Sequence, residues 1–255
     1  MTGGSGRLGR VVLEKLVGAG YDVRAASRVP RAAAGDVRWV VADLTTGAGV
    51  AEAVSGGRRG AASGVGPPYK GRYTRRVELG GTAALLRAAR AAGVRHLVYV
   101  SIVGVDRVPW GYFRTKVEAE RLVRDDGVPW TILRATQFHE FVAAGLKGMA
   151  GFGFMVADPG VPMQSVDVRD VAGRLLALVA RGPGGTIEEY GGPEVLPMED
   201  AVRRWQRARG LRRPVLRLRL PGASGRAFRA GHLTTEAHPR GTITWDDYLG
   251  AHPRP

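Results

Sequence analysis

The sequence contains no cysteine among its 255 residues. This absence excludes a disulfide framework, a thiolate zinc site and a cysteine nucleophile, and it is typical of a reducing cytoplasm. No stretch approaches the roughly 18 consecutive apolar residues that a membrane span needs. The start, MTGGSGRLGR, has no apolar core of a secretion signal. We therefore expect a soluble, cytoplasmic protein with no membrane partner.

Lysine is also scarce, since only four of the 38 basic residues are lysine and the net charge is +15. The excess is concentrated near the end of the chain, where residues 201–255 carry twelve arginines against three acidic residues. A basic surface attracts nucleic acid electrostatically. The chain has no helix-turn-helix or zinc-finger pattern to deliver sequence recognition, so nucleic acid is not the partner we expect.

Short apolar runs alternate with helical patterns, which is typical of a parallel α/β sheet. Apolar spacing predicts helices at about 7–18, 82–92, 111–126 and from about 137. Strands are predicted at 21–26, 37–42, 96–101 and 130–133. Beyond residue 150, glycine and proline become dense and shorter elements are expected. The prediction is one nucleotide-binding domain at 1–150 and a smaller substrate-binding cap at 151–255.

Two expected strands are missing from this pattern. A glycine-rich phosphate loop normally follows a strand, yet only Met1 precedes Thr2. Residues 55–64, SGGRRGAASG, lack the branched side chains of a buried strand, so the fourth strand is doubtful. Two separate hypotheses explain the gaps: a true start upstream of Met1, and a one-base slip within codons 57–61. The DNA sequence tests them.

A glycine loop, Thr2-Gly3-Gly4-Ser5-Gly6-Arg7-Leu8-Gly9, opens the first predicted helix. Glycines at this spacing allow a tight turn and close approach of a pyrophosphate to the free N–H groups of the helix. The spacing alone is weak evidence, because it recurs at Gly145, Gly148 and Gly151 without a helix behind it. The first loop is therefore either a dinucleotide site or a plain glycine-rich turn, and its context favours the site.

The carboxyl ends of the next two strands carry further candidates. Ser27-Arg28 stands where a site for NAD usually has an acid, and an arginine there suits the 2′-phosphate of NADP. The alternative is an ordinary surface arginine. Asp43-Leu44 is a candidate neighbour of adenine, although Asp43 equally suits a helix cap. NADP(H) is predicted over NAD(H).

The most chemical pattern is Tyr112-Phe-Arg-Thr-Lys116, eleven residues after Ser101 at the end of a predicted strand. Positions i and i+4 share one helix face, so the ammonium of Lys116 is expected to lower the pKa of Tyr112 from its ordinary ~10. Such a phenol exchanges a proton with a carbonyl or alcohol while hydride moves. Ser101 would bind the same substrate oxygen. The alternative is a packed tyrosine with a surface lysine.

The five histidines show no metal-ligand spacing, and no metal is predicted. His139-Glu140 lacks the second histidine of a zinc motif and is a surface pair or a pocket residue. Ligands bind at the carboxyl edge of open α/β sheets. Gln137, Phe138 and His139 follow a predicted strand at that edge and are candidate substrate contacts.

Several motifs together resemble a known family: TGGSGRLGR, YVSIVGVDRVPWGYFRTKVEAE, VPWTILRATQF, VDVRDVA and YGGPEV. They resemble the NmrA-like, NAD(P)H-binding branch of the atypical short-chain dehydrogenase/reductases, from Thr2 to about Leu249. The interruption at 55–72 is the main departure. The resemblance implies a Rossmann-type, doubly wound parallel sheet with a small C-terminal cap, and a catalytic triad of Ser101, Tyr112 and Lys116. The predicted cofactor contacts are Gly3, Ser5, Gly6, Arg7, Leu8, Gly9, Ser27, Arg28, Asp43, Leu44 and Lys116.

Two functions follow from this resemblance. The first is an NADP-dependent oxidoreductase acting on a small carbonyl, alcohol or quinone-like substrate. In it, Tyr112 is the acid or base, Lys116 tunes Tyr112 and binds the ribose, and Ser101 orients the substrate. The alternative is a non-catalytic redox sensor that binds NADP and a protein partner. The sequence leaves the oligomeric state open, a homo-oligomer included.

Overall fold

The computed structural model describes residues 1–32, 36–57, 59–62 and 71–252, with the backbone alone for 59–62. The chain divides into two compact units. Unit 1 comprises residues 1–101, 111–134 and 172–188, and unit 2 comprises residues 102–110, 135–171 and 189–255. This interleaving differs from the single predicted boundary at residue 150. Within the described ranges, no helix combines the length and apolar character that crossing a bilayer requires.

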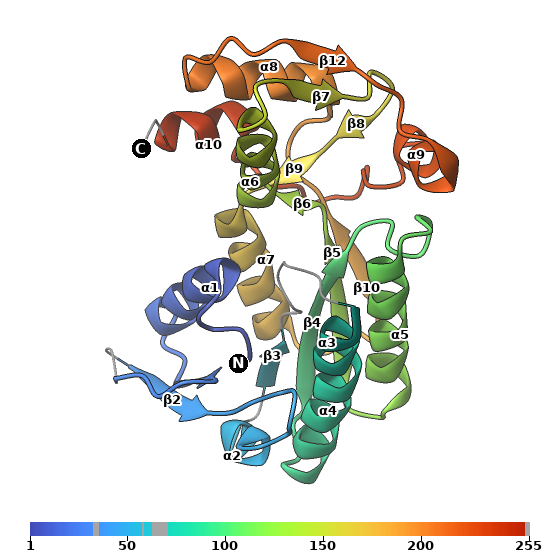
Figure 1. Ribbon diagram of the computed structural model, residues 1–255. Helices are drawn as coiled ribbons and strands as arrows, with labels where there is room; N and C mark the ends of the chain where they lie inside the picture. The colour runs from blue at the N-terminus through green and yellow to red at the C-terminus, as the bar shows by residue number, and fades with distance from the viewer. Residues whose placement is uncertain (33–35, 58, 63–70, 253–255) are drawn as a thin grey trace. The chain divides into compact units, whose positions relative to one another are not determined.

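Unit 1 alternates strands and helices as predicted. Its boundary with unit 2 falls within α7 and β10 and before the last residue of β4 and of β5. Helices α1 and α7 lie on one side of strands β4 and β5, and helices α4 and α5 lie on the other (Figure 1). This is the doubly wound, Rossmann-type α/β arrangement. Its elements are α1 (Arg7–Gly18), β1 (Val23–Ser27), β2 (Val37–Val41), α2 (Val50–Val54), β3 (Arg59–Ala62), α3 (Gly71–Arg75), the π-helix η1 (Arg76–Gly81), α4 (Thr82–Ala91), β4 (His96–Ile102), α5 (Gly111–Asp125), β5 (Trp130–Ala135), α7 (Val168–Arg181) and β10 (Ile187–Tyr190).

Periodicity predicted the core of unit 1 well. In α1, the buried residues Leu8, Val12 and Leu16 recur every four positions and form one face of the helix. In β4, the first six residues are all buried, which confirms the strand covered on both faces that its continuous apolar run predicted. Tyr99 of β4 packs in a cluster with residues of α4 and α5. This core fixes the carboxyl end of β4, where Ser101 lies.

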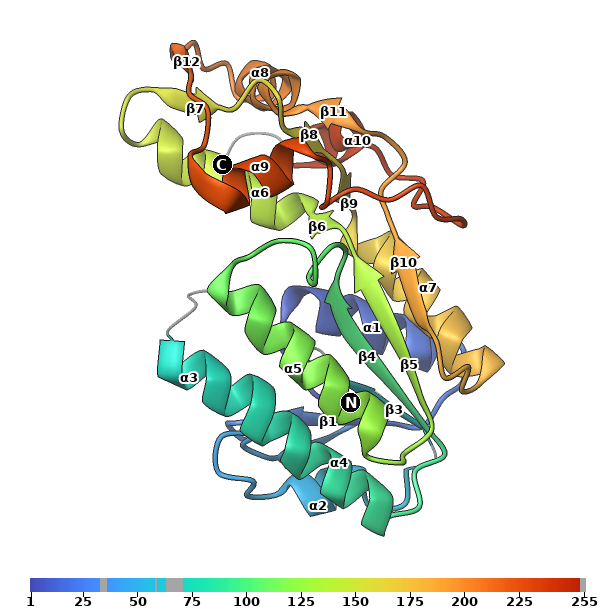
Figure 2. The same ribbon diagram turned by 90° about the vertical axis from the view of Figure 1, so that its right-hand side faces the viewer.

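The strands of unit 1 form two sheets. Strands β1 and β2 pair in parallel, and a second sheet has the order β10-β5-β4-β3 (Figure 2). Of the residues before α1, Met1 pairs with β1: its nitrogen donates to the Arg24 carbonyl at 2.6 Å and its carbonyl accepts from Ala26 N at 2.8 Å. One residue thus stands where the sequence pattern led us to expect a whole first strand.

The prediction that residues 55–64 cannot supply a strand is wrong for 59–62. These residues form β3, which runs parallel to β4 with Arg59 opposite His96 and Ala62 opposite Tyr99. Strand propensity depends strongly on context, and the long buried strand β4 supplies a complete hydrogen-bonding partner. Residues 58 and 63–70 of the interrupted segment lie outside the described residues.

Unit 2 contains short strands around a second apolar core formed by α6, α8 and α10. The strands beyond residue 150 are short, as expected, but two helices there are not: α7 has 14 residues and α8 has 11. The helices of unit 2 are α6 (His139–Ala150), α8 (Met198–Ala208), α9 (Gly222–Arg229) and α10 (Trp245–Ala251). Its strands are β6 (Gln137–Phe138), β7 (Met155–Ala157), β8 (Pro162–Met163), β9 (Ser165–Val166), β11 (Leu196–Pro197) and β12 (Val215–Arg217).

Candidate functional site

The glycine loop makes a tight turn directly before α1. Gly3 has a φ of 70°, and its carbonyl accepts a hydrogen bond from Gly6 N at 3.0 Å. A Cβ added to Gly9 would lie 2.0 Å from the Gly3 oxygen. The first turn of α1 therefore packs against the loop so closely that position 9 accepts glycine only.

The start of α1 suits an anion. Its N-cap residue, Gly6, contributes no side-chain hydrogen bond, and its first turn carries no acidic residue. Helix N-termini bind phosphates through their N–H groups and dipole. The side chain of Arg7 is exposed here, Leu8 is buried under the loop and Ser5 is half-buried. The Thr2 hydroxyl is buried and has no hydrogen-bond partner among the described residues. The loop therefore offers what a pyrophosphate requires.

Two arginines gather at the carboxyl end of β1. Ser27 is buried, and its hydroxyl accepts from Val29 N at 3.3 Å and from Arg31 Nε at 3.2 Å. Arg28 is exposed and donates to the Tyr73 hydroxyl at 3.0 Å. The sequence pattern predicted Arg28 but not Arg31 or Tyr73. A second arginine three residues after Arg28 was the available signal for Arg31.

Asp43 closes a turn after β2. One of its carboxylate oxygens accepts from Thr45 N and from the Thr45 hydroxyl, both at 2.7 Å. These two bonds are the main reason that the pKa of Asp43 lies below its ordinary value. The N-cap of α2 is Gly49, so the suggestion that Asp43 caps this helix is wrong. Leu44 is partly buried against the core of unit 1.

Ser101 is 4% exposed, and its hydroxyl has no hydrogen-bond partner among the described residues. A buried hydroxyl left without a partner costs about 1–3 kcal/mol. Tyr112 is half-buried in the first turn of α5, with its ring 6.1 Å from that of Phe113. Its charged form would act electrostatically on Tyr99. Ser101 lies two residues after Tyr99 on β4, and Tyr112 at the start of α5 lies near enough to Tyr99 to act on its charge.

Lys116 lies in the interior of unit 1, with a side-chain exposure of 2%. Its Nζ lies 2.7 Å from the Tyr99 hydroxyl, 3.0 Å from the Val100 carbonyl and 3.4 Å from Glu78 Oε2. An ammonium has three N–H donors, and these three acceptors account for all of them. The alternative of a surface lysine is therefore wrong. A ribose hydroxyl could be bound only by replacing one of these contacts, of which the Glu78 contact is the longest.

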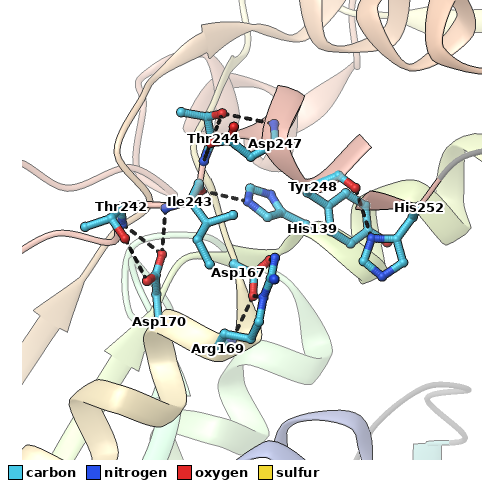
Figure 3. A network of polar contacts seen from close by, with 10 residues as sticks. All are labelled: His139, Asp167, Arg169, Asp170, Thr242, Ile243, Thr244, Asp247, Tyr248 and His252. Carbon is cyan, nitrogen blue, oxygen red and sulfur yellow. Dashed lines mark hydrogen bonds and ion pairs between the residues drawn. The ribbon is translucent and has the colours of Figure 1, made fainter. Parts of the chain in front are cut away.

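The predicted substrate residues belong to unit 2. Gln137 and Phe138 are half-buried in β6, which pairs in parallel with β9. His139 is completely buried, and its Nδ1 lies 2.8 Å from the Ser165 hydroxyl. Its Nε2 lies 3.2 Å from the Ile243 carbonyl (Figure 3). The suggestion of a surface pair is therefore wrong. Both ring nitrogens have partners, so His139 connects β9 to the segment before α10.

Taken together, the glycine loop, the anion-binding helix start and the parallel α/β arrangement define a dinucleotide-binding protein. A family model described as NAD(P)H-binding matches residues 3–181. The chain belongs to this NAD(P)H-binding family. The matched residues include all the predicted cofactor and catalytic residues.

Individual relatives are reductases by name. The (4-alkanoyl-5-oxo-2,5-dihydrofuran-3-yl)methyl phosphate reductase of Streptomyces griseus is 36% identical over 127 residues, 48% of this chain and 45% of that protein. The chain spans less than half the length of the curated relatives it matches.

Solved structures share the fold over nearly the whole chain. The NADPH-dependent quinone oxidoreductase of Escherichia coli, crystallised with NADPH, has a TM-score of 0.80 at 19% identity and covers 98% of both chains. The Citrobacter sp. triphenylmethane reductase with NADP(H) has a TM-score of 0.74 at 18% identity, covering 100% of this chain and 95% of that one. At these identities the likeness shows the fold alone.

Proposed function

We propose that this chain is an NADP(H)-dependent oxidoreductase that acts on a small carbonyl, alcohol or quinone-like substrate. The observation that carries the proposal is the buried hydroxyl of Ser101 at the carboxyl end of β4, which has no hydrogen-bond partner in the part of the chain that the structure describes. Open α/β sheets bind ligands at that edge, and a substrate oxygen would satisfy this hydroxyl. The names of the relatives, a phosphate-ester reductase and a quinone oxidoreductase, support a reductase rather than a sensor that only binds nucleotide.

When bound, the nicotinamide supplies or accepts a hydride. In the direction of reduction, Tyr112 donates its phenolic proton to the substrate oxygen, and Ser101 donates a hydrogen bond to the same atom. This bond stabilises the negative charge that develops there. Lys116 acts on Tyr112 through its charge, because its donors are used by acceptors within unit 1.

The residues of the loop fit a dinucleotide. Gly3, Gly6 and Gly9 let the pyrophosphate approach the backbone at the start of α1. Thr2 contributes a hydroxyl that no described residue hydrogen-bonds. Arg28 and Arg31, at the end of β1, would bind the 2′-phosphate through charge-assisted hydrogen bonds. This pair of arginines is the reason for preferring NADP(H) over NAD(H).

Turnover is tested by following NADPH oxidation with a panel of quinones and small carbonyl compounds. We expect Tyr112→Phe to lower kcat/KM by about 100-fold or more, with NADPH binding within about twofold of the unchanged protein. If Tyr112→Phe turns over like the unchanged protein, the assigned role of Tyr112 is wrong. Tight NADPH binding without oxidation by any compound would favour the nucleotide-sensing alternative.

Cofactor preference is tested separately by titrating NADPH and NADH and following nicotinamide fluorescence. Arg28→Ala should weaken NADPH binding about 10-fold, the value of one charge-assisted hydrogen bond, and leave NADH binding unchanged. Arg38→Ala is the matched control, because Arg38 is an exposed arginine of the neighbouring strand β2 that pairs with Asp22. Equal losses for both cofactors would contradict the role given to Arg28.

A further inference from the structure

Glu78, Tyr99 and Lys116 form a closed polar cluster in unit 1, which we call the lysine clamp. They come from η1, β4 and α5, respectively. The Tyr99 hydroxyl donates to Glu78 Oε2 at 2.9 Å and accepts from Lys116 Nζ at 2.7 Å, and the ammonium lies 3.4 Å from the same Glu78 oxygen. The side chains of Lys116 and Glu78 are 2% and 1% exposed. Neither Glu78 nor Tyr99 was a candidate from sequence.

Two features of the clamp point beyond packing. Glu78 lies in a π-helical segment between α3 and α4, and π-turns are rare and frequent at functional sites. A buried ion pair is also weak evidence for stability, because well-packed apolar residues often serve equally well. The ammonium also lies 4.2 Å from the centre of the Tyr99 ring. Tyr99, the Val100 carbonyl and Glu78 together fix the position of the ammonium.

Two acidic side chains act on the charge of Lys116: Glu78 of η1 and Glu120 of α5. Burial lowers the pKa of Lys116, and Glu78 opposes this effect more than Glu120 does. Glu120 is neutralised by Arg134 of β5 through bonds of 3.0 and 2.7 Å. Burial, followed by Glu78, raises the pKa of Tyr99 well above its ordinary value, so Tyr99 stays neutral and relays one hydrogen bond. Glu78 is therefore the main group that stabilises the charge on Lys116.

Resting on the proposed function, we propose that Glu78 and Tyr99 are positioning residues for the reaction. Glu78 keeps the buried ammonium of Lys116 charged, and Tyr99 fixes its direction, one helical turn after Tyr112. The phenol of Tyr112 then works in a constant electrostatic field. Removing Glu78 takes away the carboxylate that most opposes the effect of burial on Lys116, so the field at Tyr112 becomes weaker.

The first test reads Lys116 directly, without turnover. The chain has only four lysines, so protein labelled with ¹³C at the lysine ε-carbon gives four signals, and Lys116→Met assigns one of them. Glu78→Gln, which keeps the side-chain shape, should lower the pKa of Lys116 by about one unit or more. Tyr99→Phe should lower it less, and it serves in place of Glu78→Gln if that variant does not fold.

Glu120→Gln is the matched control, since it is the same substitution of a buried, ion-paired glutamate on α5. It should destabilise the protein but shift Lys116 less than Glu78→Gln does. An unchanged Lys116 titration in both Glu78→Gln and Tyr99→Phe would overturn the proposal.

The second test is the pH profile of kcat/KM. In Glu78→Gln, the alkaline limb of this profile should move to lower pH by the same amount as the titration of Lys116. Glu78→Asp should reverse part of this shift. A shifted Lys116 titration with an unshifted activity profile would refute the positioning role. A shifted titration in a protein that oxidises no NADPH would instead refute the proposed function and leave the clamp as a structural ion pair.

Discussion

Ser101 and Ser165 are equally buried, at 4% exposure each, but they differ in the hydrogen bonding of their hydroxyls. Ser165, in unit 2, hydrogen-bonds to His139 Nδ1 at 2.8 Å. Ser101, in unit 1, has no partner among the described residues. Native proteins satisfy nearly all buried polar groups. A closed hydroxyl is therefore typical of a structural network, and an open one indicates a place for a ligand.

The surroundings of each serine support this distinction. The His139 ring lies 5.4 Å from that of Trp245 and 5.2 Å from that of Tyr248, the latter drawn in Figure 3. Both imidazole nitrogens have hydrogen-bond partners, and these tilted ring contacts complete the surroundings of His139. In unit 1, the hydroxyls of Thr2 and Ser101 have no partner among the described residues, and a glycine loop shaped for an anion lies in the same unit. We therefore propose that the nucleotide and substrate oxygen bind to residues of unit 1, and that His139 has a structural role.

The largest expected effect comes from distorting the glycine loop of unit 1. Gly9→Ala places a Cβ 2.0 Å from the Gly3 oxygen, so the loop and α1 must separate. We expect NADPH binding to weaken by about 100-fold or more, and the free energy of unfolding to fall by about 1–3 kcal/mol. Titration of nicotinamide fluorescence and urea unfolding measure the two effects.

Gly18→Ala is the control for this change, because it lies in the same helix and its added Cβ meets nothing within 4 Å. Alanine is the better helix former, so stability should rise by up to about 1 kcal/mol with binding unchanged. If Gly9→Ala binds NADPH as Gly18→Ala does, the loop is a plain turn and not a nucleotide site.

Periodicity and glycine spacing predicted most of unit 1, since α1, β4, α5 and the loop follow from local patterns. They could not predict β3, because its pairing depends on the neighbouring strand β4 and not on its own side chains. They also missed Glu78. A π-turn has no simple sequence period, and a glutamate in a helical stretch predicts solvent exposure.

Sequence spacing likewise predicted which residues share a helix face, but not what lies opposite that face. Tyr112 and Lys116 are four residues apart on α5, as the motif required. The acceptors of Lys116 come from η1 and β4, up to 38 residues away. The role of a charged side chain therefore needed the tertiary structure.

The second prediction uses the two serines as a mirrored pair. Ser165→Ala leaves His139 Nδ1 without its partner, so the free energy of unfolding should fall by about 1–3 kcal/mol. Ser101→Ala removes an unsatisfied hydroxyl, so stability should rise by about 1 kcal/mol while kcat/KM falls by about 100-fold. Urea unfolding and NADPH oxidation by an active quinone measure the pair.

Opposite signs in stability are the essential result of this comparison. A loss of stability in Ser101→Ala as large as that in Ser165→Ala would show that the Ser101 hydroxyl has a structural role. The contrast between a Ser101 hydroxyl left for a ligand and a Ser165 hydroxyl used in a structural network would then be wrong.

The smallest expected effect is a pH dependence of the free energy of unfolding, caused by His139 in unit 2. Burial, the largest cause, lowers the pKa of His139 below its ordinary 6.5, although the Ile243 carbonyl and Asp167 oppose it. The unfolded chain therefore binds a proton at His139 at a higher pH than the folded chain does. The free energy of unfolding should fall as pH drops below about 6.5, by at most about 1.4 kcal/mol per pH unit for one proton.

Carboxylates do not obscure this window. The pKa values of Asp167 and Asp247 also lie below the ordinary value, so their stabilisation is lost only around pH 4 and below. His139→Gln removes the titrating ring, and the other four histidines of the chain remain as the internal background. Urea unfolding of both proteins between pH 7.5 and 5.5, a range chosen to lie about one unit on each side of 6.5, gives the difference. Equal slopes would mean that the imidazole titrates alike in the folded and unfolded chains, and that the network around it is open to water after all.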